Sequence, residues 1–421
     1  MTNSPPANVK SEGEKKKENR GREVCKVLAS GIDTLVLALD VTWKDRGWLD
    51  RLARCKELAK AQEGSCADML AMGEDKGGWL YDVQAHGSKG YEWLVTSNVM
   101  DLTIGNWMEP QSRPGVLVRL RSETLWARGA KASVELVGRV LTSAGAEIVR
   151  TKVSRADVCT DLLVPAAMWG PKLGDYRVTR ADSYDPHFRE ERFTGMSIGQ
   201  RGHISARIYD KAYEIAKKSK KFWMFDVWGL KEQELTEDKR MVRVEFELHR
   251  ERLKSLGIDG VEDLWRFEGN LWAYCSQEWL RFESRPGLHH TQRKVLPWWA
   301  VVQEGYAGAQ DAEPLVAGEA AKIDKKQLTR QLWGLATSLA AAGPLGDSAV
   351  NGEVVTAGDI MGVVRRAVQA MNLAPVQVVS DLRGKLAKYH RKYEKLKESL
   401  DRRAAICYES ARRDTCSGDS E

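Results

Sequence analysis

The stretch RADVCTDLLV, residues 155–164, alternates in the manner of a β-strand, yet it carries two aspartates four residues apart. In an extended chain, residues i and i+4 point to the same face and lie about 13 Å apart. Asp157 and Asp161 therefore share one face with Arg155 and Cys159, while small and apolar side chains line the other. Aspartate is depleted in strands. Two carboxylates on a strand with the pattern of a central strand therefore indicate a function beyond folding.

The composition narrows the class of protein. The chain has 421 residues, enough for two or more domains, and a net charge of +6 from 65 basic and 59 acidic residues. Its seven cysteines include no C-x-x-C pair, which fits a reducing cytosol and argues against a disulfide framework or a zinc knuckle. No apolar run reaches about 18 residues and the N-terminus is polar, so we expect a soluble cytoplasmic protein with no membrane partner. The mild positive charge permits a nucleic-acid partner without requiring one.

Strand-like runs dominate the first part of the chain. Alternating segments bounded by turn signals occur at 32–41, 79–86, 91–104, 115–122, 146–164, 194–200, 203–211 and 240–249. Helical spacing occurs at 48–61, from the predicted N-cap Ser122 to about Ala144, around the basic run KKSKK, and at 261–282. This order predicts an α+β fold with a mostly antiparallel central sheet flanked by helices, followed by a helical C-terminal region.

The chain divides into segments of different composition. We expect a disordered basic arm at 1–24, a main domain at 25–305, a linker with short helices at 306–375, an amphipathic helix at 376–412 and a tail at 413–421. The helix carries an apolar stripe at spacings of 4 and 3, formed by Leu382, Leu386, Tyr389, Tyr393, Leu396 and Leu400. A coiled coil in a homodimer and a helix that docks on its own chain fit this stripe equally well.

Three strand segments carry the residues that could perform chemistry. Besides 155–164, these are ARIYDKAYE (206–214), which offers Arg207 and Lys211, and RVEFEL (243–248), which alternates charged with apolar residues. Carboxylates from different strands on one face repel each other unless a cation lies between them, and such hard oxygen ligands suit Mg²⁺ or Mn²⁺. That cation could polarise a scissile phosphate. The alternative is a solvated face held by cross-strand ion pairs.

A tyrosine near such a cation could attack a DNA phosphodiester and form a covalent phosphotyrosine, which keeps the bond energy for rejoining. Tyr209 lies inside the second segment, and Tyr274 lies on the predicted helix that follows the third. A core aromatic is the alternative for Tyr274, because apolar residues surround it at helical spacing. The sequence contains no His-apolar-His pair, no G-x-x-x-x-G-K-[ST], no G-x-S-x-G and no H-E-x-x-H, which argues against a histidine-bound metal relaxase centre and a P-loop motor.

The three motifs SRADVCTDLLV, GQRGHISARIYDKAYE and MVRVEFELHRERL, in this order, resemble the replication initiation factor family. That family contains the rolling-circle replication initiators of small plasmids and filamentous phages, with related relaxases of mobile elements. LWAYCSQEWLRF and VLPWWAVV look like its C-terminal portion, so the likeness spans about residues 30 to 300. The resemblance implies a metal-dependent DNA nickase that acts at a replication origin through a tyrosine.

By matching position, the resemblance implies roles for individual residues. The metal ligands would be Asp157, Asp161 and Glu245. The phosphate-binding residues would be Arg155, Lys211 and Arg243. The family pattern favours Tyr274 as the nucleophile over Tyr209. The two aspartates would then lie on a central strand because a metal–phosphate site needs preorganised oxygens on a rigid element.

The basic stretch at 211–221 is a candidate DNA-binding surface. Lysines could follow the phosphates while aromatic residues of the adjoining FWMFDVW stack on unpaired bases; the lysines are Lys217, Lys218, Lys220 and Lys221. Arg207 is a further DNA-binding candidate. A solvated helix face is the alternative.

The expected partners are double- and single-stranded origin DNA, with a host helicase as a further candidate. A conjugative relaxase and a non-catalytic DNA-binding regulator are the alternative functions. The acidic residues Asp157, Asp161 and Glu245 favour an enzyme over the regulator, because a protein that only binds DNA gains nothing from carboxylates that face phosphate. They do not separate a replication initiator from a relaxase.

Overall fold

The computed structural model describes residues 25–72, 77–200, 202–231, 235–284, 292–316 and 325–371. The chain forms two compact units, one ending at Val316 and the other beginning at Ala317. The expected arm at 1–24, the helix at 376–412 with its apolar stripe, and the tail at 413–421 lie outside the described residues. No described helix is long and apolar enough to cross a membrane.

Within the described residues, the first unit is built on an eleven-stranded sheet whose neighbouring strands are all antiparallel. In spatial order, its strands are β2 (Ser65–Ala71), β3 (Gly78–Gln84), β4 (Trp93–Thr96), β5 (Met100–Ile104), β6 (Val116–Leu120), β1 (Lys26–Trp43), β7 (Ala146–Pro165), β12 (Lys239–His249), β11 (Ile204–Asp210), β10 (Arg192–Gln200) and β9 (Tyr184–Arg189). The fold is therefore α+β with a large antiparallel sheet, as the sequence predicted.

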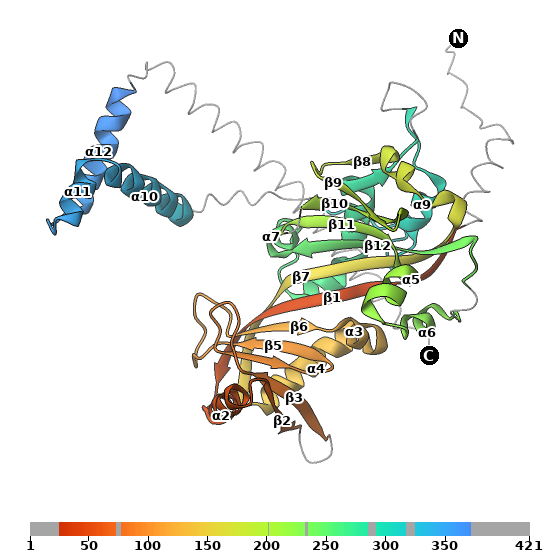
Figure 1. Ribbon diagram of the computed structural model, residues 1–421, viewed down its shortest axis with the longest axis horizontal. Coiled ribbons are helices and arrows are strands. Elements are labelled where there is room, and N and C mark those ends of the chain that lie inside the picture. Colours follow the sequence, from red (N-terminus) through yellow and green to blue (C-terminus); the bar gives the residue numbers. More distant parts are fainter. Residues whose placement is uncertain are drawn as a thin grey trace, which may run out of the picture. The chain divides into compact units, whose positions relative to one another are not determined.

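The two longest strands form the middle of this sheet. Strands β1 and β7 have 18 and 20 residues and pair along their whole length, with several register shifts (Figure 1). Strands β2 to β6 extend the sheet from the β1 side, and β12 to β9 extend it from the β7 side. A central strand is buried on both faces, which is why β7 carries buried residues at nearly every position between Ala156 and Val164.

Helices of the β1 side are α2 (Gly47–Ala61), α3 (Ser122–Arg128) and α4 (Ala130–Ser143). Helix α2 packs on the sheet through Trp48, whose ring contacts Tyr81 and whose indole N–H donates to the Tyr81 hydroxyl at 3.0 Å. The single helix predicted from Ser122 to about Ala144 is divided in two. Gly129 ends α3 with a φ of 78°, a conformation that favours glycine and interrupts helical hydrogen bonding.

The β7 side carries helical segments on both faces of the sheet. One set comprises α5 (Lys211–Glu214), the π-helical turn η3 (Ile215–Ser219) and α6 (Met224–Trp228). The other comprises α7 (Arg250–Ser255), α8 (Val261–Ala273), the π-helical turn η5 (Tyr274–Trp279) and α9 (Pro297–Glu304). Phe246 of β12 packs edge-on against Trp272 and Trp279, so α8 and η5 cover the face to which Phe246 points.

The helix predicted at 261–282 is shorter than expected. It ends in η5, after which β13 (Leu280–Phe282) pairs with β8 (Arg177–Thr179) in a separate two-stranded sheet. Two short 3₁₀ turns, η1 (Ala166–Met168) and η2 (Pro171–Tyr176), precede β8.

The main domain extends past residue 305, where the sequence suggested its end. Tyr306 stacks on Trp272 and its hydroxyl donates to Glu268, and Leu315 is buried. The second unit contains α10 (Lys325–Ala341), α11 (Pro344–Val350) and α12 (Ala357–Ala370). Helix α12 begins with a capping box between Thr356 and Asp359.

Candidate functional site

Strands β7, β12 and β11 direct their polar side chains to one face of the sheet, which we call the charged face. Directly opposed residues of antiparallel strands share a face. Asp161 lies opposite Arg243, and Arg243 lies opposite Tyr209. Asp157 similarly lies opposite Glu247 on β12. The residues between them, among them Val158 and Phe246, are buried on the other face. The division of β7 into a charged and an apolar face is thus confirmed.

One group of charged side chains is sealed from solvent; we call Asp33, Asp161 and Arg243 the closed cluster. Arg243 donates from Nε to Asp161 Oδ1 at 2.6 Å, from Nη2 to Asp161 Oδ2 at 2.7 Å, and from Nη1 to Asp33 Oδ1 at 2.6 Å. The indole N–H groups of Trp228 and Trp126 donate to Asp161 and Asp33 at 2.8 and 3.0 Å. The side chains of Arg243 and Asp161 are 0% exposed. All three ions are therefore paired, and Asp161 and Arg243 are also cut off from any ligand, whereas the Asp33 side chain keeps a small exposed area.

The closed cluster changes the roles that the sequence suggested. Asp161 is fully buried and accepts hydrogen bonds only from the buried side chains of Arg243 and Trp228, so no ion can reach it as a ligand, and Arg243 does not reach a phosphate. The sequence motifs did not predict a role for Asp33, although an aspartate inside the apolar run IDTLVLALDV is unusual and could have indicated one. Burial opposes its ionisation, but the positive charges of Arg243, Lys221 and Lys211 outweigh that effect and hold the pKa of Asp33 well below its usual range.

A second group lies nearer the surface; we call Arg155, Asp157, Arg207, Glu245 and Glu247 the open cluster. Arg155 donates from Nε and Nη2 to Asp157 at 2.8 and 2.6 Å, and from the same Nη2 to Glu247 Oε2 at 2.9 Å. Arg207 donates to Glu245 and lies 4.0 Å from Glu247. The three carboxylates are almost fully buried, whereas the side chains of Arg155 and Arg207 are 25% and 37% exposed. Two guanidinium groups and the imidazole of His249, whose Nε2 lies 2.7 Å from Glu247 Oε1, thus contact three carboxylates.

The open cluster holds more negative charge than its arginines neutralise. Burial raises the pKa of Asp157, and the charges of Glu245 and Glu247 add to this effect against the opposing hydrogen bonds of Arg155; the resulting pKa is about 6. Asp157 has a raised pKa and lies beside two other carboxylates. A cation bound at this place would therefore stabilise its ionised form. The sequence did not predict Glu247 as a ligand, although it lies two residues after Glu245 and therefore on the same face of β12.

Tyr209 joins the open cluster through its hydroxyl, which donates to Glu245 Oε2 at 2.9 Å. Tyr209 as a whole residue is half-buried, and its hydroxyl is the buried part. Lys211 Nζ lies 3.5 Å from the same hydroxyl and forms an ion pair with Glu214 at 2.9 Å. Burial and the negative charge of Glu245 raise the pKa of Tyr209 well above its usual value. The phenol therefore keeps its proton at rest and has a carboxylate in place to accept it.

Tyr274 does not approach the open cluster. It lies in η5, directly after α8, and these two segments pack on the opposite, apolar face through Trp279 of η5 and Trp272 of α8. Burial raises the pKa of Tyr274, and the charged groups that act on it are Arg252, Arg180 and Glu278. Tyr274 therefore does not fit as the nucleophile that the family resemblance favoured, because the sheet separates it from the carboxylates.

The lysines of the basic segment, residues 217–221, divide into two kinds. Lys217, Lys218 and Lys220 are exposed. Lys221 is partly buried near Asp33, and burial together with the charges of Lys211 and Arg243 lowers its pKa despite the opposing effect of Asp33. Three of the four predicted DNA-binding lysines are therefore available at the surface.

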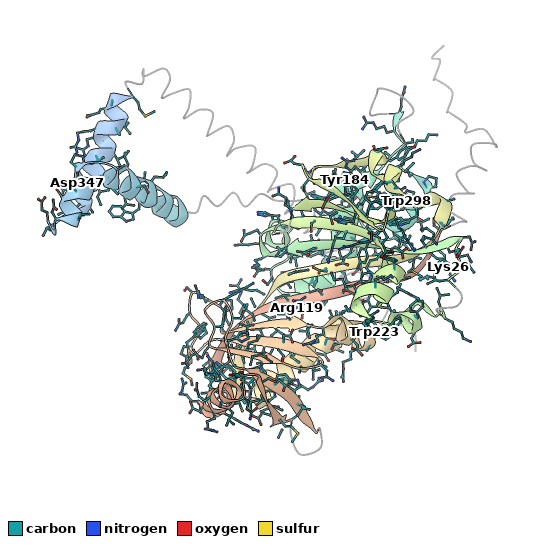
Figure 2. The ribbon with its side chains drawn as sticks, in the orientation of Figure 1. Lys26, Arg119, Tyr184, Trp223, Trp298 and Asp347 are labelled. Atoms are coloured by element: carbon teal, nitrogen blue, oxygen red, sulfur yellow. The ribbon has the colours of Figure 1, made fainter. Side chains whose placement is uncertain are left out.

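The aromatic residues beside the basic segment also divide. Phe222 is 45% exposed. Trp223 packs against a buried cluster formed by Ile215, Met224, Phe225, Trp228 and Met241, and Figure 2 places it beside α6. Only Phe222 among the three aromatic candidates has much free surface on which a base could stack.

In the described part of the chain, no group of three or more His, Cys, Asp or Glu side chains is arranged to hold a metal ion. In the open cluster, Arg155 and Arg207 occupy the acceptor sites between the carboxylates. The donor chemistry of Asp157, Glu245 and Glu247 nevertheless fits Mg²⁺ or Mn²⁺, because all are carboxylates and their charge exceeds that of the arginines.

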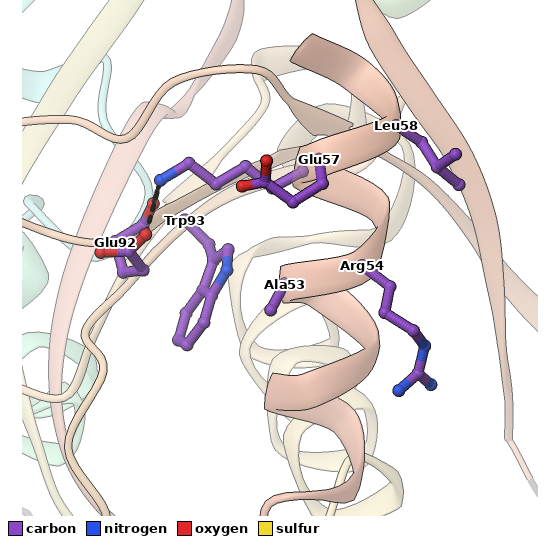
Figure 3. Close-up of a pocket in the computed structure, with 7 residues that line it drawn as sticks. Ala53, Arg54, Glu57, Leu58, Glu92 and Trp93 are labelled. Carbon is purple, nitrogen blue, oxygen red and sulfur yellow. Dashed lines mark hydrogen bonds and ion pairs between the residues drawn. The ribbon is translucent and has the colours of Figure 1, made fainter. Parts of the chain in front are cut away.

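A separate surface cavity of about 620 Å³ lies beside α2 (Figure 3). Its lining includes Ala53, Leu58 and Trp93, and its charged groups include the ion pair between Lys56 Nζ and Glu92 Oε1 at 2.6 Å. An apolar hollow with a satisfied ion pair offers no converging reactive groups. The open cluster is the stronger candidate for a reaction site.

Comparison with protein-family models and with curated proteins found no match to this chain.

Proposed function

We propose that the protein cuts and rejoins one DNA strand at a replication origin, with Tyr209 as nucleophile, and so initiates rolling-circle replication as a member of the replication initiation factor family. The observation that carries this proposal is the 2.9 Å hydrogen bond from the Tyr209 hydroxyl to Glu245 within a cluster of arginines and carboxylates. The order of the three sequence motifs supports the family, and all three meet on the charged face.

The geometry supports a division of labour between Tyr209 and Glu245. Glu245 accepts the phenolic proton as the Tyr209 oxygen attacks phosphorus, which removes the cost of a free phenolate. Because the pKa of Tyr209 is raised, proton transfer has to accompany attack. The product is a phosphotyrosine ester whose energy is close to that of the phosphodiester, so a free 3′-hydroxyl can reverse the reaction.

Arg207 and Arg155 are suited to the phosphate. Both are partly exposed, and both already donate to anionic oxygens on the charged face. A guanidinium group offers paired donors that match the non-bridging phosphate oxygens. A phosphate could therefore take over hydrogen bonds that the carboxylates hold in the free protein. Arg243, sealed in the closed cluster, contributes by fixing the strands.

Asp157, Glu245 and Glu247 are the residues that would hold Mg²⁺ or Mn²⁺. When bound, such an ion neutralises charge on the phosphate in the transition state. Its binding would displace guanidinium groups from these carboxylates, which frees Arg155 and Arg207 for the substrate. The exposed lysines of the basic segment would add non-specific attraction for DNA.

Two other functions use the same surface. A conjugative relaxase would perform the same chemistry at a transfer origin, and the choice of DNA distinguishes it. A non-catalytic regulator would bind origin DNA without cutting it. The buried carboxylates favour an enzyme, because ions of this kind are costly to bury and repel phosphate.

The decisive experiment incubates the protein with supercoiled plasmid that carries the DNA flanking its coding sequence, with Mg²⁺ or Mn²⁺. We expect open-circular DNA linked covalently to protein, and mass spectrometry should find the nucleotide on the Tyr209 peptide. Tyr209→Phe should abolish the covalent product. Tyr274→Phe is the matched control and should retain it, since that residue lies on the other face. A nucleotide on the Tyr274 peptide, or full attachment by Tyr209→Phe, contradicts the proposal.

A further inference from the structure

Three polar side chains on the outer strands β9 and β10 continue the charged face beyond Tyr209. His187 Nε2 lies 2.8 Å from Ser197 Oγ, and His187 Nδ1 lies 3.8 Å from Asp185 Oδ2. Thr194 fixes this part of β9 by donating to the His187 carbonyl at 3.2 Å. His187 is partly exposed, so it is both held in place and open to a substrate.

The strand register connects His187 to the nucleophile. His187 lies opposite Gly195 on β10, and Gly195 lies opposite Tyr209 on β11. In the neighbouring row, Ser197 lies opposite Arg207. Neighbouring strands are about 4.8 Å apart, so the backbones of His187 and Tyr209 are separated by roughly 10 Å. Both side chains extend from the same face over this gap.

Gly195 lies between the two residues and allows β10 to approach β11 closely. A Cβ atom at this position would lie 2.7 Å from the Cβ of Tyr209 and 2.5 Å from the Ile208 carbonyl oxygen. Within the described strands, Gly195 is the residue directly between Tyr209 and His187. It has no side chain, so only backbone lies between the Tyr209 ring and the imidazole of His187.

In-line displacement at phosphorus requires groups on two opposite sides. The attacking oxygen gives up a proton on one side, and the leaving 3′-oxygen requires a proton on the other. Glu245 lies on the β12 side of Tyr209, and His187 lies on the β9 side. Lys211 lies at the Tyr209 hydroxyl and is paired with Glu214, so it belongs with the nucleophile.

We propose that His187, oriented by Ser197, donates the proton to the leaving 3′-oxygen during nicking and takes it back during rejoining. This inference rests on the proposed function. The Tyr209 oxygen–phosphorus bond forms as the bond from phosphorus to the 3′-oxygen breaks. The Tyr209 proton passes to Glu245, and the proton of the protonated imidazole passes to the 3′-oxygen. Rejoining reverses each transfer, so the cycle restores both residues.

The test compares two oligonucleotides that contain the nick site mapped with the wild-type protein. One has the natural 3′-oxygen at the scissile bond, and the other has sulfur there. A thiolate leaves without protonation, so it does not need the acid. His187→Gln should slow cleavage of the natural strand by about 10²- to 10⁴-fold and leave cleavage of the sulfur strand within a few-fold of wild type.

His86→Gln is the matched control, because His86 is an exposed histidine in the connection between β3 and β4. It should cleave both strands like the wild type. Equal losses on both strands for His187→Gln would show a structural role and overturn the inference, as would undiminished cleavage of the natural strand. If the wild-type protein forms no covalent product with either strand, the proposed function itself fails.

Discussion

The closed and open clusters lie on the same face of the sheet, but they differ in what can reach them. In the closed cluster, Arg243 and Asp161 have no exposed side-chain surface and their hydrogen bonds are complete. In the open cluster, the carboxylates are buried while Arg155 and Arg207 face outward. Similar residue types therefore stabilise the sheet in one place and remain available to a ligand in the other. The burial of the arginine decides whether a cluster only stabilises the sheet or can also bind a ligand. The identity of the acidic residue matters less.

Removing an arginine from the closed cluster should have the largest effect on stability. Arg243→Gln leaves Asp161 and Asp33 buried without their counter-ion, which should cost about 3–5 kcal/mol in the free energy of unfolding. Arg207→Gln is the comparison in the open cluster and should cost less, because its guanidinium is partly solvated and Glu245 keeps the hydrogen bond from the Tyr209 hydroxyl. Urea denaturation of both variants measures the difference. Equal losses would remove the distinction between the clusters.

The open cluster should respond to pH through Asp157. Its pKa of about 6 in the folded state exceeds the ordinary value of 3.8, so the folded state binds this proton more tightly than the unfolded state does. This contribution to stability is present at about pH 4 and is lost as the pH rises through about 6. Relative to the Asp157→Asn variant, the wild type should lose up to about 3 kcal/mol between pH 4 and 7.

Denaturant titrations of both proteins across this pH range provide the measurement. Added Mn²⁺ should reduce the pH dependence of the wild type, because a bound cation favours the ionised carboxylate. A stability difference that stays constant from pH 4 to 7 would show that Asp157 has no excess of negative charge around it.

Glu245 should matter for reaction far more than for folding. Glu245→Gln keeps the shape of the side chain but removes the base that receives the Tyr209 proton, so nicking should fall at least about 10²-fold while duplex binding persists. Glu268→Gln is a close control, because Glu268 also accepts a hydrogen bond from a tyrosine hydroxyl, that of Tyr306. A gel assay for open-circular product separates them. Comparable nicking by the two variants would exclude Glu245 as the base.

The smallest effect should come from the basic segment. Alanine at Lys217, Lys218 and Lys220 together should lower the slope of log affinity against log salt by roughly two to three, if all three contact phosphates. Lys221→Ala is the control and should leave the slope nearly unchanged, because that side chain faces Asp33. Fluorescence anisotropy with labelled DNA at several salt concentrations measures both. An unchanged slope in the triple variant would show a solvated surface that does not touch DNA.

Local patterns predicted the part of the site that depends on a single strand. The alternation of RADVCTDLLV correctly placed Asp157 and Asp161 on one face, because side chains of any strand point up and down in turn. The same rule paired Glu245 with Glu247. The alternation could not predict which carboxylate is cut off from ligands. Asp161 is covered by Trp228 of α6 and by Arg243 of β12, which are distant in the sequence.

The sequence by itself determined most of the central strands, the α+β class and the polar face of β7 and β12, since each follows from the period of neighbouring residues. It did not predict the outer strands β2 and β9 or the short pair β8 and β13. The tertiary structure decided which residues meet. Asp33 and Arg243 are 210 positions apart, and no local period links them. Tyr209 and Tyr274 were equally reachable along the chain, but the packing of Trp272 and Trp279 on Phe246 put one of them behind the sheet. Strand neighbours and helix faces are fixed by burial of apolar surface across the whole domain, and that is a property of the folded chain.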